Sequence, residues 1–395
     1  MPVIVGASFL INMISEFFIW FSDIKIFKEK NKKYLTEKFG NAIMMPRNTN
    51  VCKDEVIELK GSTLKQIAKE LGLSISTVSR AVNGKNVVKE ETRCKVMELV
   101  EKYAYSPNEV ARALQKSSTQ MIAVVLPDVS EAFFGTIVNE MDRVVSQKKY
   151  MLILADTHEK VDKEIQLLQM LHARRIEALV LASVDVTGDS VSCFSGSNTP
   201  VVFIDNVPHL ENIDAITIDN QKASCMAIEY LLERGHRQIA TIIGSREETT
   251  GLERMIGYRT ALKKNGITVN EKLIEYGDYK RESGYLAMKR LLAIRQAEPF
   301  SAVYVTSEKM TYGAIQAIRE SGLNVPEDIS VMGFDIHTSE DGWRQRITSI
   351  RQPESLIGRL VGERLLVRLG CTDDVTRERI SLDPLLEEGD TVRKI

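Results

Sequence analysis

Residues 63–84 read TLKQIAKELGLSISTVSRAVNG, and this stretch decides the fold of the N-terminal part of the chain. Thr63 and Gln66 form a T-x-x-Q capping box at its start. The apolar residues that follow recur at the i, i+3, i+4 and i+7 spacing of an amphipathic helix: Leu64, Ile67, Ala68 and Leu71. Gly72-Leu73-Ser74 then makes a three-residue turn, and Asn83-Gly84 ends a second helix. The apolar face of that helix holds Val78, Ala81 and Val82, and its polar faces hold Ser76, Thr77, Ser79 and Arg80. This is a helix-turn-helix pattern.

A third amphipathic helix is expected from about residue 90, where Glu90 and Glu91 suit the positive end of the helix dipole. The charge of the region is positive, because residues 62–116 carry ten basic and six acidic side chains, a net charge of +4, whereas the whole chain has −2. A local basic face favours contacts with phosphates. The same pattern also occurs in structural helical hairpins, so the next segment decides between the two interpretations.

Residues 105–116, YSPNEVARALQK, show a second pattern of interest. Ser106 can cap a helix there, and Pro107 occupies its first position. The strong apolar positions of this helix are Val110 and Leu114. Isolated helices shorter than about 12 to 15 residues are marginal in water. We therefore expect the segment to become helical only when it binds its partner.

Three motifs resemble the lac repressor and galactose repressor (LacI-GalR) family of bacterial transcription regulators: T-L-K-Q-I-A, S-x-S-T-V-S-R-x-x-N-G and Y-x-P-N-x-x-A-R-x-L. The resemblance implies that the second helix reads the major groove of DNA and that the short hinge helix enters the minor groove. It assigns base readout to Ile75, Ser76 and Arg80, since an arginine can fork onto guanine. It assigns to Leu114 the role of an apolar wedge that bends DNA. Ile75 has the alternative of packing in the core. The other candidate DNA contacts from these motifs are Thr63, Thr77, Ser79, Asn83, Asn108 and Ala111.

The expected macromolecular partners follow from this interpretation. One helix-turn-helix has only about four base-reading side chains, whereas two symmetric copies read a palindrome with more specificity. We therefore expect a homodimer that binds a palindromic operator of double-stranded DNA.

From residue 121 onward, apolar runs alternate mostly with helical stretches. The runs are residues 122–126, 151–154, 178–182, 201–204, 239–243, 302–305 and 329–334. This alternation predicts an α/β fold with parallel sheets covered on both faces. The resemblance implies a periplasmic-binding-protein-like (type I) effector domain with two subdomains around a cleft. The expected domains are a leader (1–60), a helix-turn-helix DNA-binding domain (61–106), a hinge helix (107–118) and an effector-binding and dimerisation domain (119–388).

Candidate ligand-binding residues follow the apolar runs, because open α/β sheets bind ligands beyond the carboxyl ends of their strands. Acidic residues at such positions can instead cap the next helix. The family resemblance separates the two roles, since PDVSEAFF, PVVFID, ERMIGYR, YGDY and MGFD match pocket-forming segments. It nominates Phe133, Phe134, Asp205, Arg254, Tyr279, Glu308 and Asp335 as effector-binding residues. We expect Arg254 and Asp335 to lie on loops that face the cleft rather than in the core.

The pocket segments depart from the family pattern at three places. Glu131-Ala132 stands where many relatives have Asn-Pro, Ser307-Glu308 stands for Asn-Asp, and Ile336 stands for a second Asp. A sugar or phosphosugar is the default effector that the family implies. These three departures change the acidic positions of the pocket, so a different sugar, a nucleoside-like ligand or a partner protein is also allowed.

Residues 1–21, MPVIVGASFLINMISEFFIWF, are apolar apart from Glu16 and are long enough for a membrane span. Three interpretations are open: a start codon assigned too far upstream, a true membrane anchor, or a packed or disordered leader. The basic run from Lys25 to Lys33 would keep the rest of the chain inside the cell. We expect a cytoplasmic regulator, and the alternative is a membrane-anchored sugar-sensing protein.

The composition excludes several other classes of protein. With 44% hydrophobic and 27% charged residues, the chain is neither collagen-like nor largely disordered. Its five cysteines and five histidines show no metal-ligand spacing, so neither a metal nor another cofactor is expected. Dinucleotide-binding, Walker-type and nucleophile-elbow motifs do not occur in the sequence. An enzyme on the same scaffold therefore has no positive support.

Overall fold

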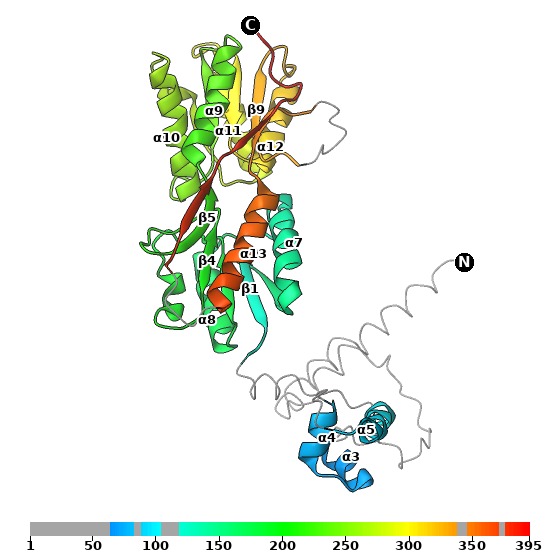
Figure 1. Ribbon diagram of the computed structural model, residues 1–395. Helices are drawn as coiled ribbons and strands as arrows, with labels where there is room; N and C mark the ends of the chain where they lie inside the picture. Colours follow the sequence, from blue (N-terminus) through cyan, green and yellow to red (C-terminus); the bar gives the residue numbers. More distant parts are fainter. Residues whose placement is uncertain (1–63, 83–87, 104–117, 338–345, 371–375) are drawn as a thin grey trace, which may run out of the picture. The chain divides into compact units, whose positions relative to one another are not determined.

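The computed structural model describes residues 64–82, 88–103, 118–337, 346–370 and 376–395. The described residues form two compact units, one before and one after residues 104–117 (Figure 1). Each unit has a hydrophobic core of its own, as expected of a separate domain.

The described part of the smaller unit consists of the predicted helices: α3 (Leu64–Leu71), α4 (Ile75–Val82) and α5 (Glu90–Lys102). Their apolar faces meet in a core of Ile67, Ala68, Val78, Ala81 and Val96. Gly72 begins the turn between α3 and α4 at a φ of +62°, a conformation that residues with a Cβ rarely adopt. The Oγ of Ser74 then accepts a hydrogen bond of 3.1 Å from the backbone N–H of Thr77, which caps α4. The tight turn and the cap together fix where α4 begins.

The larger unit is α/β, as predicted, and its first subdomain is built on a parallel sheet with the strand order β11-β5-β4-β3-β1-β2. The strands are β1 (Met121–Leu126), β2 (Met151–Asp156), β3 (Ala178–Leu181), β4 (Val201–Ile204), β5 (Asp214–Ile218) and β11 (Arg379–Leu382). One face of the sheet is covered by α7 (Ala132–Val145) and α13 (Glu354–Gly370), which pack on each other. The other face carries α8 (Val161–Ala173) and the 3-10 helix η2 (Ser190–Phe194), and η1 (Ser146–Lys148) follows α7.

The second subdomain repeats this plan with the strand order β12-β10-β9-β8-β6-β7. Its strands are β6 (Ile239–Ile243), β7 (Ile274–Tyr276), β8 (Ala302–Val305), β9 (Ser330–Phe334), β10 (Ser349–Arg351) and β12 (Leu385–Glu387), of which β12 runs antiparallel to β10. Helices α9 (Asn220–Glu233) and α10 (Thr249–Lys264) pack together on one face, and α11 (Arg281–Ile294) and α12 (Glu308–Glu320) on the other. The short helix η3 (Glu271–Leu273) precedes β7.

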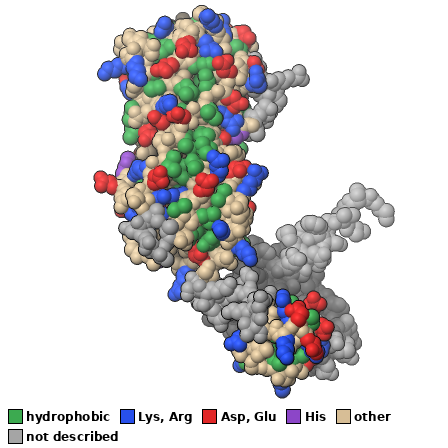
Figure 2. Space-filling model, viewed as in Figure 1, with side chains coloured by type: hydrophobic (Ala, Val, Ile, Leu, Met, Phe, Trp, Pro, Cys, Tyr) green, Lys and Arg blue, Asp and Glu red, His purple; other side chains and the backbone are tan. Residues whose placement is uncertain are grey.

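The described chain passes between the two subdomains three times: from β5 to α9, from β10 to α13 and from β11 to β12. Figure 1 shows the last passage as a long extended segment, and Figure 2 shows hydrophobic side chains gathered over the same middle region. An ion pair of 2.6 Å between Lys222 Nζ and Asp383 Oδ1 joins the first passage to the third. These three passages connect the two subdomains, which lie one above the other in Figure 1.

Each predicted apolar run forms a strand, within two residues of the predicted ends. Strands β5, β7, β10, β11 and β12 were not predicted. They are three to five residues long, and each includes a charged side chain, so they lack the continuous apolar run of a strand buried on both faces.

Candidate functional site

Helix α4 presents the predicted DNA-reading residues on its outer face. Val78 and Ala81 are buried between the helices, so the residues on the opposite side of α4 point outward. Ser76 and Arg80 are exposed, and Thr77 and Ser79 are half-buried. Ile75 is 46% exposed, which rules out the core position that was its alternative.

The remaining DNA-binding candidates lie outside the described residues: Thr63, Asn83, Asn108, Ala111 and Leu114. The same holds for the expected hinge helix up to residue 117, so its folding on DNA stays a prediction.

A cavity of about 90 Å³ lies between the two subdomains, beyond the carboxyl ends of strands from both sheets. Seven of its lining residues are the predicted effector-binding residues: Phe133, Phe134, Asp205, Arg254, Tyr279, Glu308 and Asp335. The structure therefore brings the whole predicted set to one place, although the residues come from segments about 200 positions apart in the chain.

Arg254 lies in the second turn of α10 and is only 5% exposed, so the expectation that it sits on a loop was wrong. Its Nε donates to Asn220 Oδ1 and its Nη1 to the backbone oxygen of Thr306, both at 2.8 Å. The guanidinium also stacks on the ring of Phe334, 3.7 Å from the ring centre. A charged residue predicts a loop poorly here, because this face of α10 borders the cleft, where α9 and the residue after β8 supply hydrogen-bond partners for the guanidinium.

Asp335 follows β9 directly, in the loop position that was expected, but it is buried at 9% exposure. Its carboxylate accepts hydrogen bonds of 2.8 Å from the backbone N–H and the Nε2 of Gln352, in the passage between β10 and α13. Burial nevertheless raises the pKa of Asp335 to about 6, and the nearby Arg254 opposes that rise. The acidic group thus connects the cleft to one of the three passages.

Tyr279 occupies the cleft because two glycines leave room for its ring. A Cβ on Gly244 would lie 2.1 Å from the Tyr279 ring, and one on Gly251 would lie 3.3 Å from its hydroxyl. That hydroxyl is hydrogen-bonded to Thr250 Oγ1 at 3.2 Å, and burial raises its pKa. Replacing Gly244 with any other residue would therefore move the aromatic ring.

An acidic corner made of Asp128 and Glu131 in the first subdomain faces Lys309 of the second. Lys309 Nζ lies 2.6 Å from Asp128 Oδ2 and 3.6 Å from Glu131 Oε1. Burial would raise the pKa of Asp128, but hydrogen bonds from Lys309 and Ser130 outweigh it and lower the pKa to about 2. A second ion pair between the subdomains joins Lys280 Nζ to Glu159 Oε2 at 2.8 Å. These contacts close the rim of the cleft.

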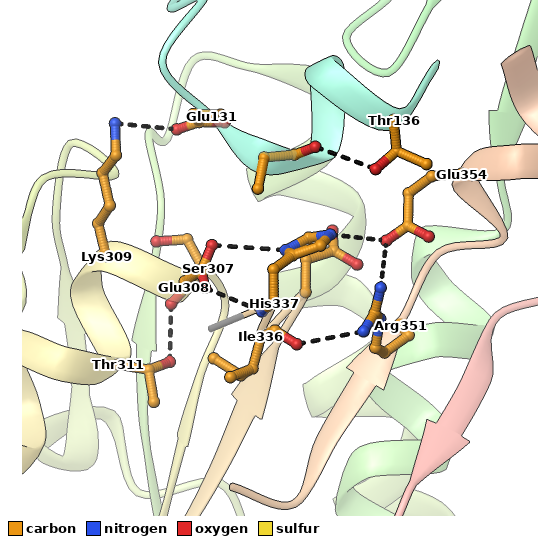
Figure 3. A network of polar contacts seen from close by, with 12 residues as sticks. Glu131, Thr136, Ser307, Glu308, Lys309, Thr311, Ile336, His337, Arg351 and Glu354 are labelled. Carbon is orange, nitrogen blue, oxygen red and sulfur yellow. Dashed lines mark hydrogen bonds and ion pairs between the residues drawn. The ribbon is translucent and has the colours of Figure 1, made fainter. Parts of the chain in front are cut away.

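Glu308 is held by His337 rather than left free in the cleft (Figure 3). The Glu308 carboxylate accepts from the His337 backbone N–H at 2.9 Å and lies 3.4 Å from its Nδ1. The Nε2 of His337 bonds Glu354 at 2.9 Å, and Arg351 reaches the same carboxylate at 3.0 Å. Burial lowers the pKa of His337, but the two glutamates outweigh it and raise the pKa to about 10. The imidazolium thus links a cleft residue to the first residue of α13.

Comparison with known proteins identifies both units of the chain. Residues 119–385 match the family of periplasmic binding proteins and sugar binding domain of the LacI family, and residues 63–108 match the bacterial regulatory proteins of the lacI family. The chain belongs to the LacI family. It is 33% identical over 326 residues to catabolite control protein A of Priestia megaterium, covering 82% of this chain and 97% of the relative.

Two solved structures of LacI-type regulators resemble the larger part of the chain. One is the lac repressor dimer bound to operator and the anti-inducer ONPF, with a TM-score of 0.74 and 26% identity over 85% of this chain and 100% of that one. The other is the transcriptional regulator CelR in complex with cellobiose, with a TM-score of 0.64 and 28% identity over 83% and 99% of the two chains. This LacI-family chain is thus a DNA-binding transcriptional regulator controlled by a ligand.

Sequence reasoning missed several residues of the LacI-type cleft, including Glu159, Glu248, Lys309 and His337. Glu159 lies three residues after the end of β2, and Glu248 lies five residues after the end of β6. Lys309 and His337 follow the predicted residues Glu308 and Asp335 by one and two positions, so a wider window after each strand would have included all four. In the described ranges, none of the helices is both long and apolar enough to span a membrane, and no cluster of metal-ligating side chains occurs.

Proposed function

We propose that this LacI-family chain is a cytoplasmic repressor that binds a palindromic operator as a homodimer and whose operator affinity is set by a small, carbohydrate-like effector in the cleft. The observation that carries the proposal is the convergence of the seven effector candidates on one cavity between two subdomains. A ligand there contacts both subdomains and therefore favours one of their relative arrangements over another.

The readout of DNA in this proposal rests on α4. Its exposed Arg80 suits a bidentate contact with guanine, and exposed Ile75 suits the methyl group of thymine. The hinge segment, with Leu114 as the wedge, transmits the arrangement of the subdomains to the operator, because its folding in the minor groove depends on how the two copies approach each other.

The exposed surface of β2 supports the proposed homodimer. This strand is at the edge of the first sheet, and its side chains Met151 and Leu154 are 59% and 50% exposed. Apolar residues on an open sheet edge invite pairing with another chain, so a second copy that covers them removes an aggregation risk.

Selection of operator fragments from genomic DNA, followed by sedimentation of the purified full-length chain, tests the proposal. We expect enrichment of one palindromic sequence and a dimer both free and on DNA. Binding that shows no sequence preference, or a monomer at micromolar concentration with and without operator, would overturn it.

A further inference from the structure

The cleft has more carboxyl groups than basic groups. Seven carboxyl-bearing side chains line it: Asp128, Glu131, Glu159, Asp205, Glu248, Glu308 and Asp335. The basic residues that line the same cavity are Arg254, Lys309 and His337. Charges of one sign in an enclosed site with low-dielectric walls repel ligands of that sign and attract the opposite sign.

The basic groups of the cleft are already engaged with the protein. Lys309 is paired with Asp128, and His337 lies between Glu308 and Glu354. Arg254 is held by two hydrogen bonds and by stacking on Phe334. An incoming phosphate would therefore have to break an existing ion pair before it gained the charge of Lys309 or of His337.

Three carboxyl groups of the cleft have weaker compensation. Asp205 and Glu248 have no ion pair within the described residues, and Glu131 lies 3.6 Å from a lysine that is closer to Asp128. All three line the same cavity, and the charge of Asp205 contributes to raising the pKa of each of the other two. Burial raises the pKa values of Glu131 and Glu248 to about 7, and the nearby charges of Lys309 and Arg254, respectively, do not offset that rise.

The chain itself shows which group fits this corner of the cleft. Lys309 comes from the opposite subdomain and places its ammonium group between Asp128 and Glu131, with Ser130 Oγ at 3.4 Å. The corner thus already binds a protonated amine with oxygen ligands, in the geometry of a charge-assisted hydrogen bond.

We infer that the effector carries a protonated amine on a hydroxyl-bearing or similar small frame, and that phosphorylated ligands are excluded. The amine pairs with the carboxylates of Glu131, Asp205 and Glu248, and Tyr279 covers an apolar face of the ligand. The inference rests on the proposed effector function of the cleft and adds the chemical class of its ligand.

Calorimetric titration of the full-length chain with matched probes tests the inference: glucosamine, glucose and glucose 6-phosphate, the corresponding galactose series, and putrescine. We expect at least one amine to bind at least tenfold more tightly than its neutral or phosphorylated counterpart. Its binding enthalpy should also change with the ionisation enthalpy of the buffer, because Glu131 and Glu248 release protons as they pair with the amine.

Two variants test whether the preference for the amine comes from a carboxyl group of the cavity. Glu248→Gln should reduce the preference for the amine at least fivefold, whereas Glu247→Gln should leave it unchanged, since Glu247 is exposed and does not line the cavity. Tighter binding of a neutral or phosphorylated probe, or no binding of any amine, overturns the inference. If such a non-amine probe still changes operator affinity, the proposed function stands; if the chain binds no operator, the proposed function fails by itself.

Discussion

Replacing Arg254 with methionine removes the central cation of the cleft while keeping most of the aliphatic volume of the side chain. The loss includes two hydrogen bonds of 2.8 Å from a charged donor and the stacking on Phe334. Hydrogen bonds to charged groups contribute about 1.5 to 3 kcal/mol each, and a desolvated cation–π contact about 2 kcal/mol. Because these terms are not additive and the side chain is costly to desolvate, we expect a net loss of about 3 to 5 kcal/mol, as is typical when one partner of a buried charge cluster is removed.

The assay is urea unfolding of the full-length chain, followed by circular dichroism, with Arg246→Met as the matched control. Arg246 also stacks on an aromatic ring, that of Tyr276 at 3.7 Å, but it is exposed, so its replacement should cost only about 0.5 to 1 kcal/mol. A decrease of less than about 1 kcal/mol in the free energy of unfolding of Arg254→Met would refute the reasoning. Arg254 would then contact the ligand without stabilising the fold.

Three further predictions concern DNA readout, pH and helix packing. Arg80→Ala should weaken operator binding by about 1 to 3 kcal/mol and relax the preference at one base position, measured by competition with single-base operator variants; equal loss on all sequences would indicate a phosphate contact instead. Glu248→Gln should become more stable relative to the unmodified protein as pH rises from 4.5 to 7. In the unmodified protein the folded-state pKa of Glu248 is about 7, above the ordinary glutamate value of 4.5, so the folded state holds a proton that the unfolded state has released, and the stability gained from that proton is lost as the pH rises through 7. Parallel pH profiles of the two proteins in thermal unfolding would contradict this. Gly358→Ala should destabilise the chain by about 1 to 3 kcal/mol, since its Cβ would lie 2.4 Å from the backbone oxygen of Ile137. The control Gly135→Ala has nothing within 4 Å of its Cβ and should be neutral or stabilising by about 0.5 to 1 kcal/mol. Equal shifts in Tm for the two variants would show that α7 and α13 move apart without cost.

The elements that sequence reasoning located are those whose pattern is local. The apolar spacing of Ile67, Ala68 and Leu71 reports a helix face directly, and the run at 122–126 reports a strand buried on both faces. Strand β11 reads RISL and is half-exposed at an edge, so its pairing with β5, more than 160 residues earlier, leaves little mark on its own composition.

In the site, too, sequence reasoning found the residues that follow a local pattern and missed the contacts between residues distant in the chain. Residues at strand ends, such as Asp205 and Asp335, were predicted because the position of a ligand site follows from the topology of the sheet. The ion pair between Lys309 and Asp128 joins residues 181 positions apart, and no local pattern marks it. Arg254 was assigned to the right cavity but to the wrong kind of element, because its partners Asn220 and Thr306 are distant in sequence.

The interleaved course of the chain has a consequence for its synthesis. The first sheet begins with β1 at Met121 and is completed only by β11, which ends at Leu382, 13 residues before the C-terminus. While the second subdomain emerges from the ribosome, the edge of β5 and the face later covered by α13 are without their partners. A nascent chain that stops before residue 379 therefore contains every residue of α4 and the cleft but an unfinished first sheet. The first sheet therefore gains its last strand only after Arg379–Leu382 has been synthesised.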